Sequence, residues 1–595
     1  MSSTPLEQYA FLSDGQTGAL ISQAGSLDWL CFPRFDSEAL FTALLGTEEH
    51  GRWLMAPKDG TLLHRSYRDN TFIVDSQWET PTGKATITEF MPVNTGQFNE
   101  SDVVRSVSCT EGTVEIEHDL RLRFNYGASV PWVERVKVRD EWALAAIAGP
   151  TSIHLFGPRL SADGYSHGGT YTLREGETEC WTMVWSPSYE PVPEVEDHTV
   201  LEAITAVYWN KWAEKIDVRG PYSAEIVRSL LVLRALTDSR TGGIVAAATT
   251  SLPEEFGGSR NWDYRYTWLR DSALTIEALV AHGFTDGALA WRDWLLRAIA
   301  GDTHSLRIMY GLAGERHLPE FELHHLPGYE NSTPVRIGNG AASQFQGDVV
   351  GEVMVALDKV RRAGIKETER SWGLQKELLK FAEENFDRPE HGIWETRGEL
   401  TTFTHSRVMM WAAFDRGISA VRDFGYDGPV KHWEQLRDRL EHEIEEKGWN
   451  EEIQSYTQTY DATEVDASLL QLPQIGYCAY DDPRMLSTVA RMETDLVDNA
   501  GFVHRYRTAS QVDGLEGDEY PFLICTFWLV EQYAMTGRIE EAKKLMDALV
   551  SIASPLGLLA EEYSPVHSRL AGNFPQAFSH LGLIRAADSL EDKLN

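Results

Sequence analysis

SRVMMWAAF (406–414) and VKHWEQLRDRLEHEIEEKG (430–448) are neighbouring segments with opposite patterns of polarity, and their contrast decides the predicted fold. In the second segment Trp433, Leu436 and Leu440 recur at helical spacing, which predicts a helix with one apolar stripe and a charged outer face. The first segment is apolar nearly all round, which is typical of a helix that is buried on every side. The two segments therefore predict an outer and an inner helix of one helical domain.

The same alternation of amphipathic and apolar helices continues along the chain after Pro221. The pattern predicts about twelve helices and no convincing strand, with long connections from each outer helix to the next inner one. Six outer and six inner helices in alternation describe an (α/α)6 barrel, and all its long loops lie above the N-termini of the inner helices. Long loops in a compact domain usually carry function, so we expect the site there. The predicted helices begin near Ser223, Asp271, Asp286, Asp348, Ser371, His405, Val430, Ala467, Pro483, Asp518, Arg538 and Gly572.

The N-terminal part of the chain follows a period of two instead. From about residue 5 to 190, alternating segments such as FIVDSQWETPTGKATITEFMPV (72–93) are separated by Gly, Asp, Pro and Thr turns, which predicts an antiparallel β-sandwich. The period becomes helical in DHTVLEAITAVYWNKWAEKI (197–216). We therefore predict an N-terminal β-sandwich domain at 1–196, a linker helix at 197–221 and a catalytic (α/α)6 barrel at 222–595.

The composition excludes several classes of function. Asp and Glu outnumber Lys and Arg by 90 to 54, and the net charge of -36 would repel nucleic acid and an anionic membrane surface. The five cysteines are scattered without CxxC spacing, which argues against a disulfide framework and a zinc site. We see no secretory signal and no run that approaches the length of a membrane span. We therefore expect a cytoplasmic protein that uses neither a metal nor a cofactor.

The predicted loops combine Trp, Tyr and Arg with carboxylates, as in RNWDYRYTWLRD (260–271), HGIWETRGE (391–399) and LLAEEYSP (558–565). Rings that stack on sugar faces, together with groups that bind hydroxyls, indicate a neutral polyhydroxylated ligand. Glu395 and Glu561 lie on loops that would face each other across the barrel mouth. Glycoside hydrolysis uses such a pair, one carboxyl protonated to donate to the leaving oxygen and one ionised to activate water or attack carbon.

Each of these residues also has a purely structural explanation. A glutamate in a loop is usually a solvated charge or a helix cap, and Asp271 could cap its helix with Arg270 as its ion-pair partner. Trp262, Trp268 and Trp394 could belong to the core. Composition by itself leaves these alternatives open.

Longer motifs in the right order resemble a known family. They are DGQTGALISQAGSLDWLCFPRFDSEALFTALLG (14–46), TWLRDSALTIEALV (267–280), RIGNGAASQFQGDVVGEVM (336–354), GIWETRG (392–398), FTHSRVMMWAAFDR (403–416), VDASLLQLP (465–473), FWLVEQYA (527–534), LLAEEYSP (558–565) and GNFPQAFSHLGLI (572–584). The chain resembles glycoside hydrolase family 15, the glucoamylase and bacterial trehalase family, over essentially its whole length.

The resemblance implies an enzyme that removes glucose from a non-reducing end with inversion. It implies that Glu395, which follows a Trp, is the general acid and that Glu561, the first Glu of AEEY, is the general base. In the family an Arg-Asp pair binds the hydroxyls of the terminal glucose, and the resemblance assigns this role to Arg270 and Asp271. Trp394 would pack on the ring of the same glucose. Fungal glucoamylases carry a second carboxylate after the acid, and Thr396 stands here instead, which argues against a preference for maltodextrins. The predicted substrate-binding residues are Arg270, Asp271, Trp268, Trp394 and Glu562.

The leading hypothesis is an inverting exo-acting α-glucosidase that releases β-D-glucose from a small α-glucoside, with α,α-trehalose as the favoured substrate. The alternatives are a glucoamylase or an isomalto-oligosaccharide glucohydrolase, a disaccharide phosphorylase, and a carbohydrate-binding protein without activity. Glu395 precedes the sixth predicted helix and Glu561 the twelfth, on opposite sides of a six-pair ring. We therefore expect their carboxyl groups to lie about 6.5 to 9.5 Å apart, as in inverting enzymes, rather than about 5 to 5.5 Å.

Overall fold

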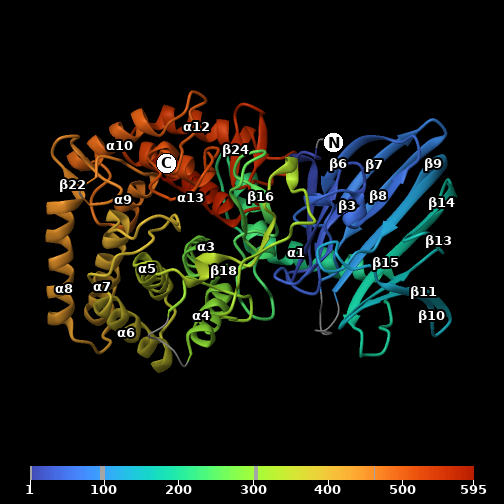
Figure 1. The fold of residues 1–595 in the computed structure, drawn as a ribbon, viewed down its shortest axis with the longest axis horizontal. Coiled ribbons are helices and arrows are strands. Elements are labelled where there is room, and N and C mark those ends of the chain that lie inside the picture. Colours follow the sequence, from blue (N-terminus) through green and yellow to red (C-terminus); the bar gives the residue numbers. More distant parts are fainter. Residues whose placement is uncertain (1–2, 94–100, 301–305, 461, 595) are drawn as a thin grey trace.

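The computed structural model describes residues 3–93, 101–300, 306–460 and 462–594. A sheet-rich part built from the N-terminal third of the chain lies beside a helical part built from the rest (Figure 1). Helix α1 (His198–Ala213) follows the last strand of the sheet-rich part. The predicted combination of an antiparallel β domain, a connecting helix and a helical barrel is confirmed.

The N-terminal part consists of two antiparallel sheets that share one long strand, β9 (Ser101–Arg121). The first half of β9 pairs with β8 and β15, and its second half pairs with β5 and β14. In β5 buried Trp53 and Met55 alternate with partly exposed neighbours, as expected for a strand with one face on a core. The other strands are β1 (Tyr9–Ser13), β2 (Gly18–Ser22), β3 (Ser26–Cys31), β4 (Ala39–Phe41), β5 (Arg52–Pro57), β6 (Thr61–Tyr67), β7 (Val74–Thr80), β8 (Gly83–Phe90), β10 (Trp132–Val138), β11 (Glu141–Ala148), β12 (Thr151–Phe156), β13 (Ser161–Asp163), β14 (Ser166–Arg174) and β15 (Thr178–Pro187).

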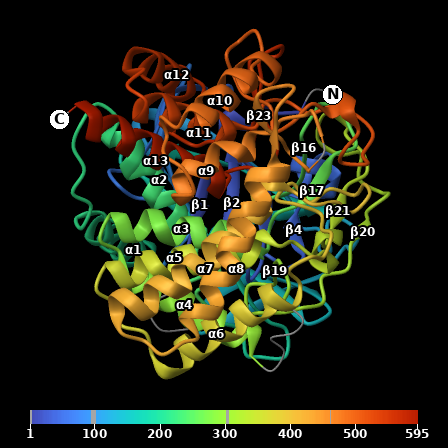
Figure 2. The same cartoon turned by 90° about the vertical axis from the view of Figure 1, so that its left-hand side faces the viewer.

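The helical part alternates between helices that are buried on every side and helices with one solvent face. The inner set is α3 (Leu269–Ala281), α5 (Asp348–Arg362), α7 (Thr404–Phe424), the short η8 (Ala467–Leu470) with α9 (Gln471–Ile475), α11 (Leu523–Met535) and α13 (Ala577–Leu594). The outer set is α2 (Ser223–Ala235), α4 (Thr285–Ile299), α6 (Glu369–Glu384), α8 (Val430–Glu443), α10 (Pro483–Asp495) and α12 (Ile539–Ser551). Helix α3 packs against α5 and α13, α5 against α7, and α11 against α13, which closes much of the inner ring (Figure 2).

Three expectations need correction. The helices expected to begin near Asp518 and Gly572 begin at Leu523 and Ala577, because the residues before them form the wall of a pocket and are held in extended conformations by long-range contacts. Short strands also occur after Pro221, where the sequence predicted none, because the loops pair with one another locally. These strands are β16 (Thr250–Pro253), β17 (Asn261–Asp263), β18 (Thr267–Trp268), β19 (Met309–Tyr310), β20 (Phe321–Glu322), β21 (Arg336–Ile337), β22 (Trp449–Asn450), β23 (Ser455–Tyr456), β24 (Glu562–Ser564) and β25 (Arg569–Ala571).

The β domain fixes the loop that leads into α3. Arg265 is fully buried where the two parts meet, and it donates to Asp263 Oδ2 (2.6 Å) and to the backbone oxygen of Ser37 (2.8 Å) in the β domain. Asp263 Oδ2 also accepts from the backbone N–H of Gly338 (3.1 Å). A buried guanidinium is tolerated only when its donors are satisfied, so this arrangement holds the loop in one position.

Within the described residues, we find no helix that is both long enough and apolar enough to cross a membrane.

Strand β15 ends at Pro187, α1 begins at His198 and α2 begins at Ser223. From these bounds we propose that the chain divides into a β domain at 1–196, a linker helix at 197–221 and a helical barrel at 222–595.

Candidate active site

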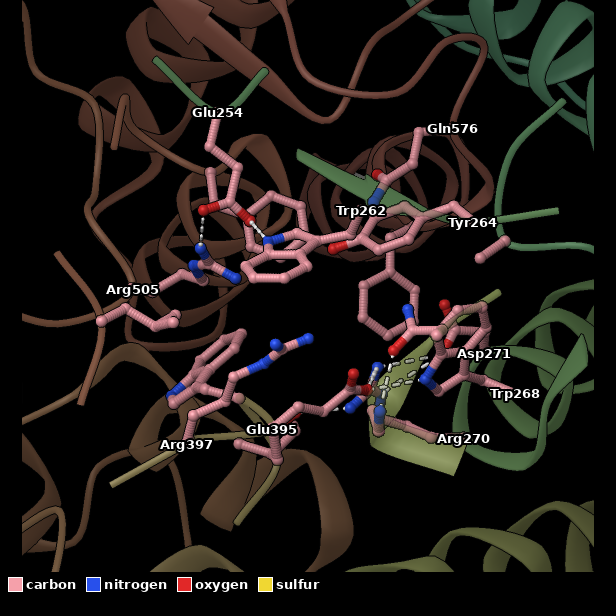
Figure 3. A pocket seen from close by; sticks show the side chains of 18 of the residues that line it. Glu254, Trp262, Tyr264, Trp268, Arg270, Asp271, Glu395, Arg397, Arg505 and Gln576 are labelled. Atoms are coloured by element: carbon pink, nitrogen blue, oxygen red, sulfur yellow. Dashed lines mark hydrogen bonds and ion pairs between the residues drawn. The ribbon is translucent and has the colours of Figure 1, made fainter. Parts of the chain in front are cut away.

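A pocket opens at the N-terminal ends of the inner helices, where the long loops gather (Figure 3). Helix α3 contributes Arg270 and Asp271 from its first turn, and the segment at the start of α13 contributes Gln576 and Phe578. The loops supply the rest of the wall, as the sequence predicted for this end of the barrel. The lining residues are Ala246, Glu254, Trp262, Tyr264, Trp268, Arg270, Asp271, Asn339, Ala341, Ile393, Trp394, Glu395, Arg397, Arg505, Tyr506, Leu515, Phe522, Gln576 and Phe578.

Glu395 stands on a tight turn that aims its side chain into the pocket. Its φ is 58°, which is uncommon for a residue other than glycine, and its backbone N–H donates to the oxygen of Gly392 (3.1 Å). The Gln344 amide donates to the backbone oxygens of Glu395 and Thr396 (both 3.1 Å). Strained backbone of this kind persists where surrounding contacts impose it, and it is frequent at functional sites.

The surroundings of the Glu395 carboxyl favour its protonated form. The side chain is 19% exposed, and burial raises the pKa of Glu395, while the neighbouring Arg270 opposes this shift. The indole N–H of Trp268 donates to Glu395 Oε1 (2.6 Å), and Arg270 Nη2 lies 3.5 Å from the same oxygen. Glu395 therefore has one carboxyl oxygen held in place and a raised pKa, the properties expected of a general acid.

Arg270 and Asp271 form an ion pair at the pocket wall. Arg270 Nε donates to Asp271 Oδ2 (3.2 Å), and Nη1 donates to the backbone oxygen of Ile393 (2.5 Å) in the turn before Glu395. The Arg270 guanidinium carbon also lies 5.1 Å from the centre of the Phe578 ring. The ion pair that the sequence suggested as a structural role for Arg270 and Asp271 is present. Both residues also line the pocket, so they remain candidates for binding hydroxyl groups of a sugar.

The two predicted tryptophans both line the pocket while most of each ring is buried. Trp268 ends β18 and is connected to Glu395 by the hydrogen bond described above. Trp394 donates its indole N–H to Asp466 Oδ2 (2.7 Å), and its ring lies near Phe522 and Trp528. Both rings are therefore fixed parts of the wall.

Glu561 and Glu562 are not among the residues that line the pocket. Glu561 is buried, and its Oε2 accepts from the backbone N–H of Asn573 (3.1 Å). A Cβ at Gly572 would lie 2.6 Å from the Glu561 Cβ, so the chain needs glycine here to bring the two segments together. Glu562 is fully buried and accepts from the backbone N–H of Tyr520 (3.2 Å). Contact of Glu562 with substrate stays a prediction, and the structure places its carboxylate inside the wall.

Glu254 is a lining carboxylate that the sequence did not reveal. It follows the end of β16, and Figure 3 shows it on the side of the pocket opposite Glu395. Glu254 Oε2 lies 2.9 Å from Arg505 Nη2, and Oε1 accepts from the indole N–H of Trp262 (3.1 Å). The pairing of β16 with β17 and the ion pair with the distant Arg505 hold this residue at the site, so no local motif could have identified it.

Glu254, Glu561 and Glu562 form one group of buried carboxylates, with an oxygen of each within 4.8 Å of the others. Burial, followed by the charge of Glu254, raises the pKa of Glu561 to about 8, while Arg505 opposes this shift. Three carboxylates at such distances are also able to ligate a cation, yet Arg505 already supplies a positive charge to the group. Carboxylates this close share protons, so they titrate as a coupled set.

The side chain of Thr396, at the position where fungal glucoamylases have a second carboxylate, does not reach the pocket. It is buried, and its Oγ1 donates to the backbone oxygen of His391 (2.9 Å). The next residue, Arg397, lines the pocket instead. Tyr264 and Arg397 lie in the aromatic- and arginine-rich loops noted in the sequence, and Arg505 and Tyr506 lie in a similar segment, HRYR (504–507). Nothing in the composition of these segments distinguishes residues that line the pocket from their neighbours.

Comparison with known proteins identifies the family of this chain. The family model described as "Glycosyl hydrolases family 15" matches residues 220–588, and "Trehalase-like, N-terminal" matches residues 1–161. A protein named trehalase from Mycobacterium tuberculosis is 35% identical over 613 residues, which cover 98% of this chain and 89% of the relative. A protein named trehalase from Thermoplasma volcanium is 33% identical, covering 99% of this chain and 94% of the relative.

A solved structure shares the whole architecture. A bacterial glucoamylase complexed with acarbose superposes with a TM-score of 0.73 at 13% sequence identity, covering 99% of this chain and 94% of the glucoamylase. At that identity the likeness concerns the fold alone. The family match extends from α2 to α13, and two relatives are at least 33% identical over nearly the full chain. The chain therefore belongs to glycosyl hydrolase family 15.

Proposed function

We propose that this protein hydrolyses α,α-trehalose with inversion at one anomeric carbon, with Glu395 as general acid and Glu561 as general base. The observation that carries the proposal is the arrangement of the pocket. Glu395 lies beside the Arg270–Asp271 pair on one side, and Glu254 lies on the other (Figure 3). The carboxylate oxygens of Glu254 and Glu561 lie within 4.8 Å of each other. Two carboxyl groups on opposite sides of a sugar-sized site suit an inverting hydrolase.

In this mechanism Glu395 donates its proton to the oxygen that joins the two glucose units. Trp268 and Arg270 hold one oxygen of its carboxyl group, at 2.6 and 3.5 Å, and they also stabilise the carboxylate that remains after donation. Arg270 and Asp271 bind hydroxyls of the glucose that is cleaved, with Trp394 as a rigid surface beside its ring. Because the sugar is fixed next to Glu395, protonation of the glycosidic oxygen becomes effectively unimolecular.

Glu561 removes a proton from the attacking water, which approaches the anomeric carbon from the face opposite the leaving sugar. The backbone N–H of Asn573 fixes one oxygen of the Glu561 carboxylate. Glu254 lines the pocket, and its carboxylate oxygen lies within 4.8 Å of an oxygen of Glu561. The predicted separation of about 6.5 to 9.5 Å between acid and base remains a prediction and leaves room for that water.

Trehalose is favoured as substrate because the relatives that match nearly the full chain are named trehalases. The buried position of Thr396 adds to this, since the residue that follows Glu395 in the sequence adds no carboxylate to the pocket. We also propose that the protein acts on this small disaccharide in the cytoplasm. Its five cysteines are all free, as expected for a protein in a reducing compartment.

A substrate panel tests the function. We expect rapid glucose release from trehalose and much slower release from maltose, isomaltose and maltotriose, without a requirement for phosphate. Inversion gives one β-glucose and one α-glucose per trehalose, because the leaving sugar keeps its α configuration, and proton NMR of the fresh products detects both. Two α-glucose molecules would contradict inversion. Faster release from maltotriose would favour a glucoamylase, and glucose 1-phosphate formed only with phosphate would favour a phosphorylase.

The pH dependence of kcat/KM provides a second prediction. Activity requires ionised Glu561 and protonated Glu395, so the acid limb belongs to Glu561 and the alkaline limb to Glu395. The charge of Glu254 raises the pKa of Glu561, and the Glu254→Gln variant removes that charge. The Glu561 pKa then falls, its carboxylate persists to lower pH, and the acid limb moves to lower pH while the alkaline limb stays. An unchanged acid limb would show that Glu254 does not influence the base.

A further inference from the structure

Two arginines stack on the same tryptophan at the pocket, but only one of them reaches the lining. The guanidinium carbon of Arg397 lies 4.4 Å from the centre of the Trp262 ring, and that of Arg336 lies 4.6 Å from it. Arg397 and Trp262 line the pocket, whereas Arg336 donates to the backbone oxygens of Ser259 (2.9 Å) and Asn261 (3.1 Å). Arg336 thus holds the loop, and Arg397 is exposed to a ligand.

Arg397 is held firmly although its side chain is 34% exposed. Its Nη1 and Nη2 donate to the two carboxylate oxygens of Glu320, at 3.1 and 2.7 Å, and Glu320 Oε2 also accepts from the backbone N–H of Gly340 (3.0 Å). The backbone N–H of Arg397 donates to the oxygen of Asp513 (2.7 Å). The bidentate pairing uses two of the five guanidinium N–H donors and leaves others for a ligand.

The position of Arg397 relative to the acid indicates which sugar it meets. Arg270 and Asp271 lie on one side of Glu395, and Figure 3 shows Arg397 on its other side, between Glu395 and Trp262. Glu395 must reach the oxygen that joins the two sugars, so the leaving sugar extends from Glu395 away from the Arg270–Asp271 pair. Thr396 is turned inward and cannot contact it.

We infer that Arg397 binds hydroxyls of the leaving sugar, that Trp262 provides a flat surface for its ring, and that Glu320 orients the guanidinium. The inference rests on the proposed function in one respect, the assignment of Glu395 as the acid. The ligand class is a neutral pyranose, because Glu320 pairs with Arg397 and, at 3.8 Å, with Arg336, and because the carboxylates Glu254 and Asp271 line the same pocket as Arg397.

The test compares Arg397→Met with Arg336→Met, which make the same chemical change on the same tryptophan. The readout is the ratio of kcat/KM for trehalose to kcat/KM for α-glucosyl fluoride, whose leaving group does not occupy the leaving-sugar site. This ratio does not depend on how much of the protein is folded. We expect it to fall by about ten- to a hundredfold in Arg397→Met, mainly through KM, since a lost hydrogen bond from a charged donor has an effect of this size. In Arg336→Met we expect a much smaller fall of the ratio, because Arg336 supports Trp262 and Glu320 but does not line the pocket.

Equal losses on both substrates in Arg397→Met would overturn the inference, because they would mean that Arg397 only supports the turn that carries Glu395. An Arg397→Lys variant, which keeps a donor but cannot pair bidentately, should show an intermediate ratio and covers the case in which the methionine variant does not fold. Failure of the proposed function is seen separately, in the wild-type protein. If the wild type prefers another disaccharide, the same ratio is measured with that disaccharide.

Discussion

The Glu395→Gln variant is expected to lower kcat for trehalose by about 10²- to 10⁴-fold, the range in which a general acid contributes. Glutamine fills the same volume and can still accept from Trp268, but it has no acidic proton to give to the leaving sugar. Fluoride needs little protonation when it leaves, so activity on α-glucosyl fluoride should fall by much less than activity on trehalose. Glucose release and fluoride release measured with the same preparation give the comparison.

Glu399→Gln is the matched control for this prediction. Glu399 lies four residues further along the same loop, is exposed and does not line the pocket, so the same chemical change there should leave both activities close to wild type. A Glu395→Gln variant that lost the two activities equally would mean that Glu395 positions the substrate or the water instead of donating a proton. The acid would then have to be another carboxyl group of the pocket.

The polarity of each helix was enough to predict the barrel, because an inner helix has no solvent face and an outer helix has one. Segment 406–414 lies within α7, which is buried along most of its length. Segment 430–448 begins with α8 (Val430–Glu443), in which only Trp433 and Leu440 are buried. The predicted start near Asp518 was wrong for a related reason. Glu519 forms an ion pair with Arg505 (2.5 Å), and Phe522 pairs with Glu562, so these residues belong to the pocket wall and not to the helix.

The candidate acid Glu395 and the candidate sugar-binding pair Arg270 and Asp271 could be proposed from the sequence because they occur in continuous motifs that resemble the family. Glu254 and Glu320 could not, since each reaches the site through contacts with a segment distant in the sequence: Glu254 with Arg505, and Glu320 with Arg397. Their roles depend on tertiary pairing, which no local pattern encodes. The same limit applies to Glu562, whose place next to Glu561 in one motif suggested a contact with substrate, while no local pattern showed that its carboxylate is buried.

The Glu561→Gln variant is expected to lose about 10²- to 10⁴-fold in kcat on both trehalose and α-glucosyl fluoride. The loss is common to the two substrates because a better leaving group removes the need for an acid, while water must still give up a proton to attack. This pattern distinguishes a base from the acid, whose replacement affects mainly trehalose. Glutamine keeps an oxygen that can accept from the Asn573 backbone N–H, so the loop around Glu561 should retain its structure.

Glu254→Gln is the decisive comparison, because Glu254 lines the pocket, Glu561 is not among the lining residues, and their carboxylate oxygens lie within 4.8 Å of each other. If Glu561 is the base, Glu254→Gln retains far more activity on α-glucosyl fluoride than Glu561→Gln, and its main effect is the shifted acid limb of the pH profile. The opposite order would make Glu254 the group that activates water and Glu561 the neighbour that raises its pKa. Either order identifies which of the two carboxylates takes the proton, since only the base must be ionised next to the attacking water.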